Sequence, residues 1–244
     1  MLKWIKYEIE DYRQLLRNVP ASATVFFVVS VVLMNLLANR EWSLGLSWLA
    51  LDCGFFVSWM SFLSMDMLTK RFGARASIKL SIFAMAVNLL VCGMLYLIMK
   101  LPGAWGAYYE LGEDIVNQGL DMTFGGTWYV VMGSAAAFLV SAIVNSIVNE
   151  RIGKRLKTNG FRAFAIRSFV STFIGQFVDN LVFATLVSYV FFGWTPLQVL
   201  TCSFTGGLVE LLCEVIFSPI GYRANKAWER DAVGARYIEW RASR

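Results

Sequence analysis

The sequence has no histidine and few charged residues. Of its 244 residues, 16% are Asp, Glu, Lys or Arg and 57% are hydrophobic, and the mean hydropathy is +0.57. About 25% of the residues of an ordinary soluble domain are charged. The shortage of charge therefore predicts a membrane protein, and the lack of histidine removes the commonest metal ligand and general base. The net charge of +5 is expected in the cytoplasmic loops of such a protein, so no nucleic-acid partner is predicted.

Cysteine is also scarce, and its positions form neither a metal-binding nor a disulfide pattern. The four cysteines lie inside apolar stretches, without the Cys-X-X-Cys spacing of zinc and redox sites. They are Cys53, Cys92, Cys202 and Cys213. We interpret them as packing residues. The sequence contains no ATP-binding loop either, so we predict neither a metal nor another cofactor.

In place of charge, the sequence has long apolar stretches. Each can cross about 30 Å of hydrocarbon as a helix that rises about 1.5 Å per residue. Six are expected, at residues 21–38, 44–66, 77–99, 127–149, 164–192 and 196–218. The predicted fold is an all-α membrane protein, with a six-helix transmembrane domain over residues 21–220. Residues 1–20 are expected to form an amphipathic helix at the membrane surface, and residues 221–244 a basic cytoplasmic tail.

The positive charges of the connecting segments alternate along the chain. The N-terminal segment, the second loop, the fourth loop and the tail contain four, three, five and six Lys or Arg residues, whereas the first and third loops contain one each and the fifth none. Lys and Arg accumulate on the cytoplasmic side of membranes. We therefore expect a multi-pass protein of the cell (inner) membrane with both termini in the cytoplasm. The third loop, rich in acidic and aromatic residues, is expected outside.

The predicted fifth helix has a polar stripe on one face. At about 100° per residue, Thr172, Gln176 and Asp179 share this face with Ser168 and Gly175. A charged side chain in hydrocarbon costs at least about 2.5–3.5 kcal/mol, so the stripe is expected to face the interior of the bundle. An acid beside an amide favours a binding site for a polar solute. A polar clamp between helices is the alternative.

Further acids lie in the predicted sixth helix. Glu210 and Glu214 are one turn apart and repel each other if both are ionised. Either one of them is protonated, or a cation lies between them. We favour a role in binding a solute or a proton, and an ion pair with Arg167 or another basic residue is the alternative.

The predicted second helix carries two acids and a tryptophan on a common face. Asp52 lies toward the outer end, and Asp66 lies at the cytoplasmic end, where a salt bridge to Lys70 or Arg71 is expected. Trp59, between the two acids, would stack on a flat ring or serve as a packing residue. Amides such as Asn35 supply polar groups to other helices and are most simply interhelical contacts.

Several runs of residues resemble one known family. They lie at 35–40, 52–54, 64–69, 71–73, 175–180 and 214–222, with the sequences NLLANR, DCG, SMDMLT, RFG, GQFVDN and EVIFSPIGY. In this order, over nearly the whole chain, they are similar to the queuosine precursor transporter family of vitamin-uptake-transporter-like proteins. The resemblance implies a six-helix bundle like the substrate-binding subunits of energy-coupling-factor importers. It also implies uptake of a 7-deazaguanine such as preQ1, preQ0 or queuine for tRNA modification.

The resemblance suggests how such a base would be held. A guanine-like edge presents adjacent N–H groups that a carboxylate accepts in bidentate fashion, and Gln176 would serve the carbonyl. Aromatic side chains such as Trp59 or Phe183 would stack on the ring. The predicted substrate-binding residues are Asp179, Gln176, Glu210, Glu214, Asn35, Asp52, Trp59, Phe183, Asn180 and Thr172.

Some choices stay open at this level. Members of the family resembled carry a basic residue near position 210, so Glu210 favours a cationic amine, preQ1 or queuine, over neutral preQ0. An importer subunit for a different vitamin or nucleobase is the alternative function. Proton coupling, an ATP-driven partner and facilitated diffusion are all compatible with the sequence. The expected partners are therefore the solute, membrane lipid, and an energising protein or a second copy of the chain. An enzyme is disfavoured, because no nucleophile elbow or metal-ligand cluster is present.

Overall fold

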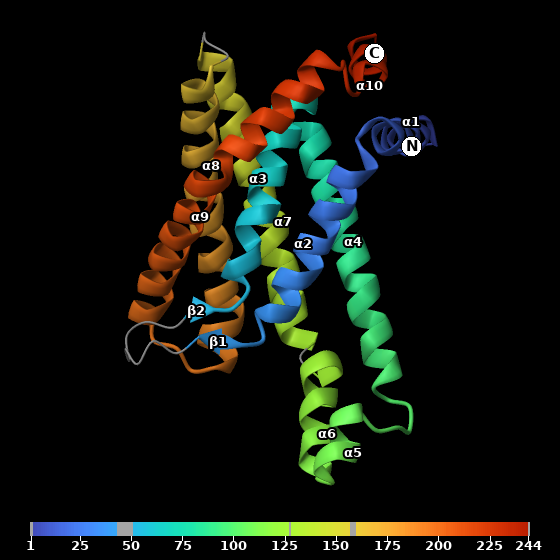
Figure 1. The fold of residues 1–244 in the computed structure, drawn as a ribbon, viewed down its shortest axis with the longest axis vertical. Coiled ribbons are helices and arrows are strands. Elements are labelled where there is room, and N and C mark those ends of the chain that lie inside the picture. The colour runs from blue at the N-terminus through green and yellow to red at the C-terminus, as the bar shows by residue number, and fades with distance from the viewer. Residues whose placement is uncertain (1, 43–50, 127, 157–159, 244) are drawn as a thin grey trace.

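The computed structural model describes residues 2–42, 51–126, 128–156 and 160–243, and it is almost entirely helical (Figure 1). The α-helices are α1 Leu2–Asn18, α2 Ala21–Leu37, α3 Phe55–Phe72, α4 Ala74–Ile98, α5 Gly106–Leu111, α6 Asp114–Asp121, α7 Trp128–Arg155, α8 Phe161–Phe183, α9 Pro196–Arg230 and α10 Ala235–Ala242. Two π-helical segments, η1 Met122–Gly126 and η2 Ala184–Tyr189, adjoin α6 and α8. The short strands β1 Glu41–Trp42 and β2 Leu51–Asp52 pair antiparallel, with Glu41 opposite Asp52.

Four stretches are long and apolar enough to cross a membrane. They are α4, residues Asp114–Arg155 around α7, residues Phe161–Tyr189 and α9. A fifth is counted if α1 and α2, which meet at an angle of 107°, are taken as one broken span. This angle is consistent with an in-plane α1 followed by a membrane-crossing α2. The chain is therefore an all-helical membrane protein with four or five such spans, and the expected sixth span stays a prediction.

The predicted second span differs most from the structure. Helix α3 begins at Phe55, eleven residues after the expected start at residue 44, because residues 51–52 pair as a strand and residues 53–54 form a turn. Residues 44–50 of this prediction lie outside the described residues. The helix contains three charged residues, Asp66, Lys70 and Arg71, within 18 residues, and it is not among the four stretches apolar enough to cross a membrane. It ends at Gly73, whose φ of +86° suits glycine and allows the sharp turn into α4.

The remaining predicted spans match helices to within a few residues at one end or both. Helix α9 is the longest, and it continues past the expected end at residue 218 to Arg230. Its start is well defined, because Thr195 and Gln198 form a reciprocal capping box and Pro196 occupies the first turn. The first part of the predicted basic tail is thus a continuation of the same helix, with Pro219 inside it.

At one end of the bundle, a cluster of ion pairs and hydrogen bonds joins the two ends of the chain (Figure 1). Lys79 Nζ of α4 lies 2.5 Å from Asp11 Oδ2 and 2.6 Å from Glu8 Oε2, and Tyr237 Oη of α10 donates to Asp11 Oδ1 at 2.9 Å. Burial raises the pKa of the Tyr237 hydroxyl, so it stays protonated and keeps donating. We call Glu8, Asp11, Lys79 and Tyr237 the clasp.

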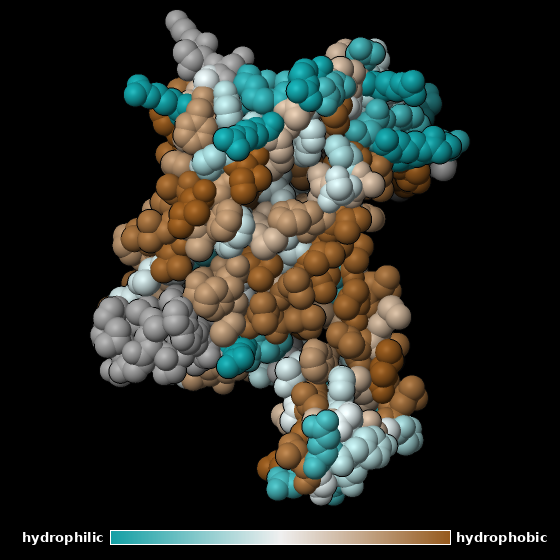
Figure 2. Space-filling view, viewed as in Figure 1, coloured by the Kyte–Doolittle hydropathy of each residue, from teal (hydrophilic) through white to brown (hydrophobic). Residues whose placement is uncertain are grey.

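The surface is apolar between two polar ends. In Figure 2, hydrophilic side chains cover the end with α1 and α10 and reappear around α5 and α6, with a broad hydrophobic band between them. Leu90 of α4, Val140 of α7 and Ile216 of α9 are exposed apolar residues of the membrane-crossing stretches. Beneath the band, Phe27, Phe62 and Phe138 of α2, α3 and α7 form a fully buried core. This distribution of polarity is what a bundle crossing a bilayer requires.

Candidate functional site

The polar stripe of α8 faces the interior of the bundle, as its spacing predicts. The side chains of Ser168, Thr172 and Gln176 have no exposed area. Gly175, on the same face, allows close packing, because a Cβ there would lie 2.7 Å from Phe62 Cε1 and 2.9 Å from Asn145 Cβ. Helix α8 is thus packed against α3 and α7 along its polar face.

Asp66 lies at the centre of this polar interior. Its Oδ1 accepts a hydrogen bond from Asn145 Nδ2 at 2.9 Å, and its Oδ2 lies 2.5 Å from Ser168 Oγ and 3.2 Å from Thr172 Oγ1. Ser171 Oγ lies 3.2 Å from Oδ1 as well. Four side chains from α7 and α8 therefore hold one carboxyl group of α3 that is 1% exposed.

The predicted salt bridge of Asp66 is wrong. Lys70 lies 3.4 Å from Glu229 of α9, and the Arg71 side chain donates to the backbone carbonyl of Val233 at 2.8 Å. Both basic side chains thus bind to α9 or the segment that follows it, whereas the Asp66 side chain is turned into the bundle. Asp66, which the sequence placed in a salt bridge at the end of the helix, is thus part of the interior network.

Glu214 of α9 approaches Asp66 through a shared hydroxyl group. Ser168 Oγ lies within hydrogen-bond distance of Glu214 Oε1 and of Asp66 Oδ2. The Glu214 side chain has no exposed area, and its Oε2 has no hydrogen-bond partner among the described residues. We call Asp66 and Glu214 the carboxyl pair.

A second polar layer lies toward the end of the bundle with β1 and β2. Ser58 of α3 donates to Glu210 Oε1, and Asn180 Nδ2 lies 3.2 Å from Glu210 Oε2. Ser141 of α7 donates to Asp179 Oδ1 at 2.7 Å. Glu210 is 3% exposed, so this acid also faces protein rather than lipid.

Gln176 lies between the two layers. It is one turn from Thr172, which contacts the carboxyl pair, and it is three and four residues from Asp179 and Asn180 of the second layer. Neither its Nε2 nor its Oε1 has a hydrogen-bond partner among the described residues, although the side chain is fully buried. An unpaired buried amide costs roughly 1–3 kcal/mol per polar group, which favours a binding role for it.

The other predicted site residues lie away from this interior network. Asn35 accepts a hydrogen bond from Ser134 and donates to the carbonyl of Val31 at 2.8 Å, so it connects α2 and α7. The ring of Trp59 stacks on Phe217 at 4.1 Å, with an interplanar angle of 10°. The Asp52 side chain lies outside the part of the structure that is described.

Phe183 packs in an apolar cluster at the junction of α7, α8 and η2. It is 9% exposed and lies with Val130, Ala137 and Val187. This environment is that of a packing residue, and the stacking role predicted for Phe183 stays untested.

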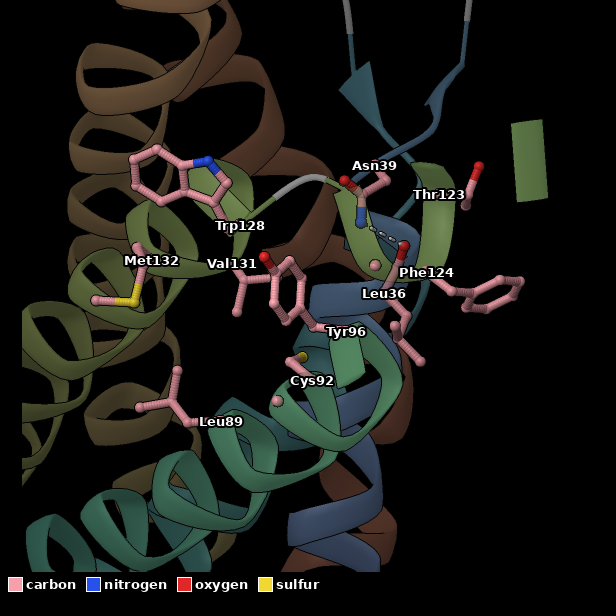
Figure 3. Close-up of a pocket in the computed structure, with 12 residues that line it drawn as sticks. Leu36, Asn39, Leu89, Cys92, Tyr96, Thr123, Phe124, Trp128, Val131 and Met132 are labelled. Carbon is pink, nitrogen blue, oxygen red and sulfur yellow. Dashed lines mark hydrogen bonds between the residues drawn. The ribbon is translucent and has the colours of Figure 1, made fainter. Parts of the chain in front are cut away.

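Two lateral cavities open between helices near this network. Trp59 and Phe217 line a groove of about 600 Å³ between α2, α3 and α9. A smaller pocket of about 280 Å³ lies between α2, α4, η1 and α7 (Figure 3). In Figure 3, Cys92 and Tyr96 of α4 lie on the opposite side of this pocket from Met132 of α7. Both cavities are mostly apolar, and none of the acids of the two polar layers lines their described walls.

Sequence reasoning placed Ser168 on the polar stripe, but it missed that hydroxyl and amide side chains hold the buried acids. Ser168 and Asn145 bind the carboxyl pair, and Ser58 binds Glu210, but serine and asparagine in apolar helices are common enough to carry no signal alone. The available signal was position, since Asn145 and Ser168 lie on helix faces that also carry other polar residues. Within the described residues, no group of three or more His, Cys, Asp or Glu side chains could hold a metal ion.

Comparison with known proteins adds one relationship. The model of the family described as "Putative vitamin uptake transporter" matches residues 52–224, which include α3 to α8 and most of α9. No curated protein matches the chain. No solved structure matches it either.

Proposed function

Because this chain belongs to the vitamin uptake transporter family, we propose that it imports a queuosine precursor, a 7-deazaguanine base, for tRNA modification. The proposal places the protein in the cell (inner) membrane with six crossings and both termini in the cytoplasm. Hydrophilic side chains cover the end that carries α1 and α10 (Figure 2), and these two helices contain several Lys and Arg residues, which supports this orientation.

Gln176 is the observation that carries the proposal. Its amide is fully buried, has no hydrogen-bond partner among the described residues and offers both a donor and an acceptor. Acids lie on both sides of it, with the carboxyl pair of α3 and α9 on one side and Asp179 of α8 and Glu210 of α9 on the other. A deazaguanine presents adjacent N–H donors and a carbonyl acceptor, and this is the complement of a carboxylate beside an amide.

In the proposed complex, the base replaces the neutral side chains that hydrogen-bond the acids when no substrate is bound. Asp179, now bound by Ser141, would accept the ring N–H and the amino group, and Gln176 would bind the carbonyl. Thr172 and Asn180 support this region by holding Asp66 and Glu210. Asn35, Asp52, Trp59 and Phe183 stay candidates for closing the site or stacking on the ring.

A ligand screen tests the proposal directly. The purified protein in detergent would be heated with preQ1, preQ0, queuine and a set of vitamins and nucleobases, because a ligand that binds the folded state raises Tm by mass action. We expect a shift with a deazaguanine, amounting to about 2.7 kcal/mol of stabilisation at a hundredfold excess over Kd. Gln176→Leu should remove the shift without lowering the Tm of the empty protein. A shift with a different vitamin alone would identify the alternative substrate.

The charge of Glu210 suggests which deazaguanine is preferred. A carboxylate in the second layer favours a ligand with a cationic amine, preQ1 or queuine, over the neutral nitrile preQ0. Competition uptake into proteoliposomes with wild type and Glu210→Lys would measure the preference. We expect the substitution to reverse it. A wild type that favours preQ0, or a preference that the substitution leaves unchanged, contradicts this assignment.

A further inference from the structure

One hydroxyl group joins the two acids of the carboxyl pair. Ser168 Oγ lies 2.5 Å from Asp66 Oδ2 and is also within hydrogen-bond distance of Glu214 Oε1. A serine hydroxyl carries one hydrogen and donates to one acceptor at a time. The other contact needs a hydrogen from the carboxyl side, so one of the two acids must be protonated. The arrangement therefore requires one carboxyl proton, which Asp66, Ser168 and Glu214 share through their hydrogen bonds.

The carboxyl pair has no ion-pair partner among the described residues, and the charge of Arg167 acts on Asp66 only from beyond contact distance. In the described part of the chain, neither Asp66 nor Glu214 has a Lys or Arg nitrogen within 4.0 Å. The printed donors to Asp66 other than Ser168 are the neutral groups of Asn145, Ser171 and Thr172. Two ionised carboxylates this close would repel each other, which a bound proton prevents.

The same region has more acceptors than donors. Glu214 Oε2 and Asn145 Oδ1 are buried and have no hydrogen-bond partner among the described residues, although Asn145 points its Nδ2 at Asp66. Both side chains have no exposed area. A buried cluster that is short of hydrogens and has no Lys or Arg nitrogen within 4.0 Å among the described residues has the properties of a site for a proton.

We infer that Asp66, Ser168 and Glu214 form the proton-binding site that couples import to a proton gradient. This inference rests on the proposed function for its substrate. The proton bound to Glu214 Oε1 passes to Ser168 Oγ as the Ser168 hydrogen passes to Asp66 Oδ2, so the pair keeps one proton and one negative charge. Loss of the proton leaves two negative charges close together, so the deprotonated pair is disfavoured in this conformation. Release of the proton is therefore tied to a conformational change of the helix bundle.

A polar chain leads from the pair toward the end with α1 and α10. Ser171 contacts Asp66, Asn149 Nδ2 lies 3.1 Å from Ser171 Oγ, and Arg167 Nε donates to Asn149 Oδ1 at 2.8 Å. The positive charge of Arg167 favours loss of a proton on this side. Release of the proton into the cytoplasm is the direction that import requires.

Other charged groups around the pair are engaged elsewhere. Lys70 of α3 pairs with Glu229, Glu150 of α7 pairs with Lys154, and Glu210 of α9 is bound by Ser58 and Asn180. Arg167 of α8 is held by Asn149, and Cys213 is the thiol next to Glu214 on α9. A pH dependence of coupling is therefore assigned to the carboxyl pair.

Proteoliposomes that contain only this protein and an internal pH-sensitive dye test the coupling. With preQ1 outside, we expect a more acidic outside solution to raise the accumulation of preQ1 in the lumen. The increase should be up to about tenfold per pH unit if one proton enters with each substrate. Substrate addition should also acidify the lumen. Asp66→Asn and Glu214→Gln should each reduce the ratio of uptake with and without the gradient to one. Asp231→Asn, which removes a carboxylate from the exposed surface, is the matched control and should keep the ratio of wild type.

Infrared difference spectroscopy gives a readout that needs no substrate. A protonated buried carboxyl shows a C=O band, which we expect in wild type and in Asp231→Asn and which either pair variant should remove or shift. Absence of any such band sensitive to Asp66 or Glu214 overturns the inference, as does gradient-driven uptake that survives both variants. Failure of wild type to take up or bind any deazaguanine overturns the proposed substrate instead, and the infrared band still decides the proton site.

Discussion

Two clusters of buried acids in this protein are stabilised in opposite ways. In the clasp, Asp11 lies 2.5 Å from Lys79, and Glu8 lies 2.6 Å from Lys79 and from Arg75. In the carboxyl pair, Asp66 and Glu214 are held by neutral hydroxyl and amide groups. The two carboxylates of the clasp are therefore balanced by Lys79 and the adjacent Arg75, whereas the pair has a negative charge that depends on one proton.

The difference separates a structural cluster from one that can change state. A buried carboxylate beside a lysine stays ionised, because the cation stabilises the charged form. A buried carboxylate among neutral donors gains or loses a proton when its surroundings change. The clasp fixes the amphipathic α1 to α4 and α10, and the pair lies among α3, α7, α8 and α9, next to the proposed substrate-binding residues of α8.

Removing the cation of the clasp should have the largest effect. Lys79→Met removes the nearest cation from Asp11, which has no exposed area, and leaves it only Arg75 at 3.8 Å and the hydroxyl of Tyr237. Such a change costs about 3–5 kcal/mol of the free energy of unfolding. Thermal unfolding in detergent would measure it. The double variant Asp11→Asn with Lys79→Met removes both charges and should recover much of the loss. Equal destabilisation in the single and double variants would show that charge compensation is not what holds the clasp.

Removing the hydroxyl of the pair should have the next largest effect. Ser168→Ala leaves two acids without the group that joins them, at a cost of about 1–3 kcal/mol. Ser146→Ala is the matched control, because Ser146 is equally buried but bonds to another hydroxyl, that of Ser77, at 3.2 Å. Its expected cost is about 1 kcal/mol. The infrared carboxyl band should move in Ser168→Ala and stay in Ser146→Ala. The same cost and an unmoved band in both would remove the special role of Ser168.

Disturbing the close packing of α8 against α3 and α7 should have a smaller effect than removing the Ser168 hydroxyl. Gly175→Ala places a Cβ 2.9 Å from Asn145 Cβ, and Asn145 is the donor to Asp66. We expect a loss of about 1 kcal/mol or more from overpacking. Gly93→Ala in α4 is the control, because a Cβ there meets no atom within 4 Å. A Gly175→Ala protein as stable as Gly93→Ala would show that α7 and α8 can separate without cost.

Sequence reasoning predicted the helices and the inward stripe of α8, because an apolar stretch and a 3.6-residue period are local properties. It failed at α3, where the β1–β2 pairing starts the helix late. It also misassigned Asp66, since Lys70 is four residues away and helical spacing alone favours a salt bridge. Whether Asp66 faces Lys70 or the polar groups of α7 and α8 depends on how α3 packs against these two helices. Helix packing is a tertiary property, and residue spacing alone does not predict it.

The partners of the acids could not be read from the sequence for the same reason. Glu210 and Glu214 are one turn apart, and the sequence suggested that they share a proton or a cation. The structure separates them into two layers, with Glu210 bound by Ser58 and Glu214 facing Ser168. The acid that shares a hydroxyl with Glu214 comes from α3, more than 140 residues earlier in the chain.

The smallest effect is expected where an acid of the clasp is partly exposed. Glu8→Gln removes one of two carboxylates from Lys79, but Asp11 keeps that lysine paired, and Glu8 is 21% exposed. The expected loss is below about 1 kcal/mol, because water already screens this side chain. Thermal unfolding beside Lys79→Met gives the comparison. A loss as large as that of Lys79→Met would mean that both carboxylates are needed to balance the lysine, and the clasp would then depend on net charge more than on the burial of Asp11.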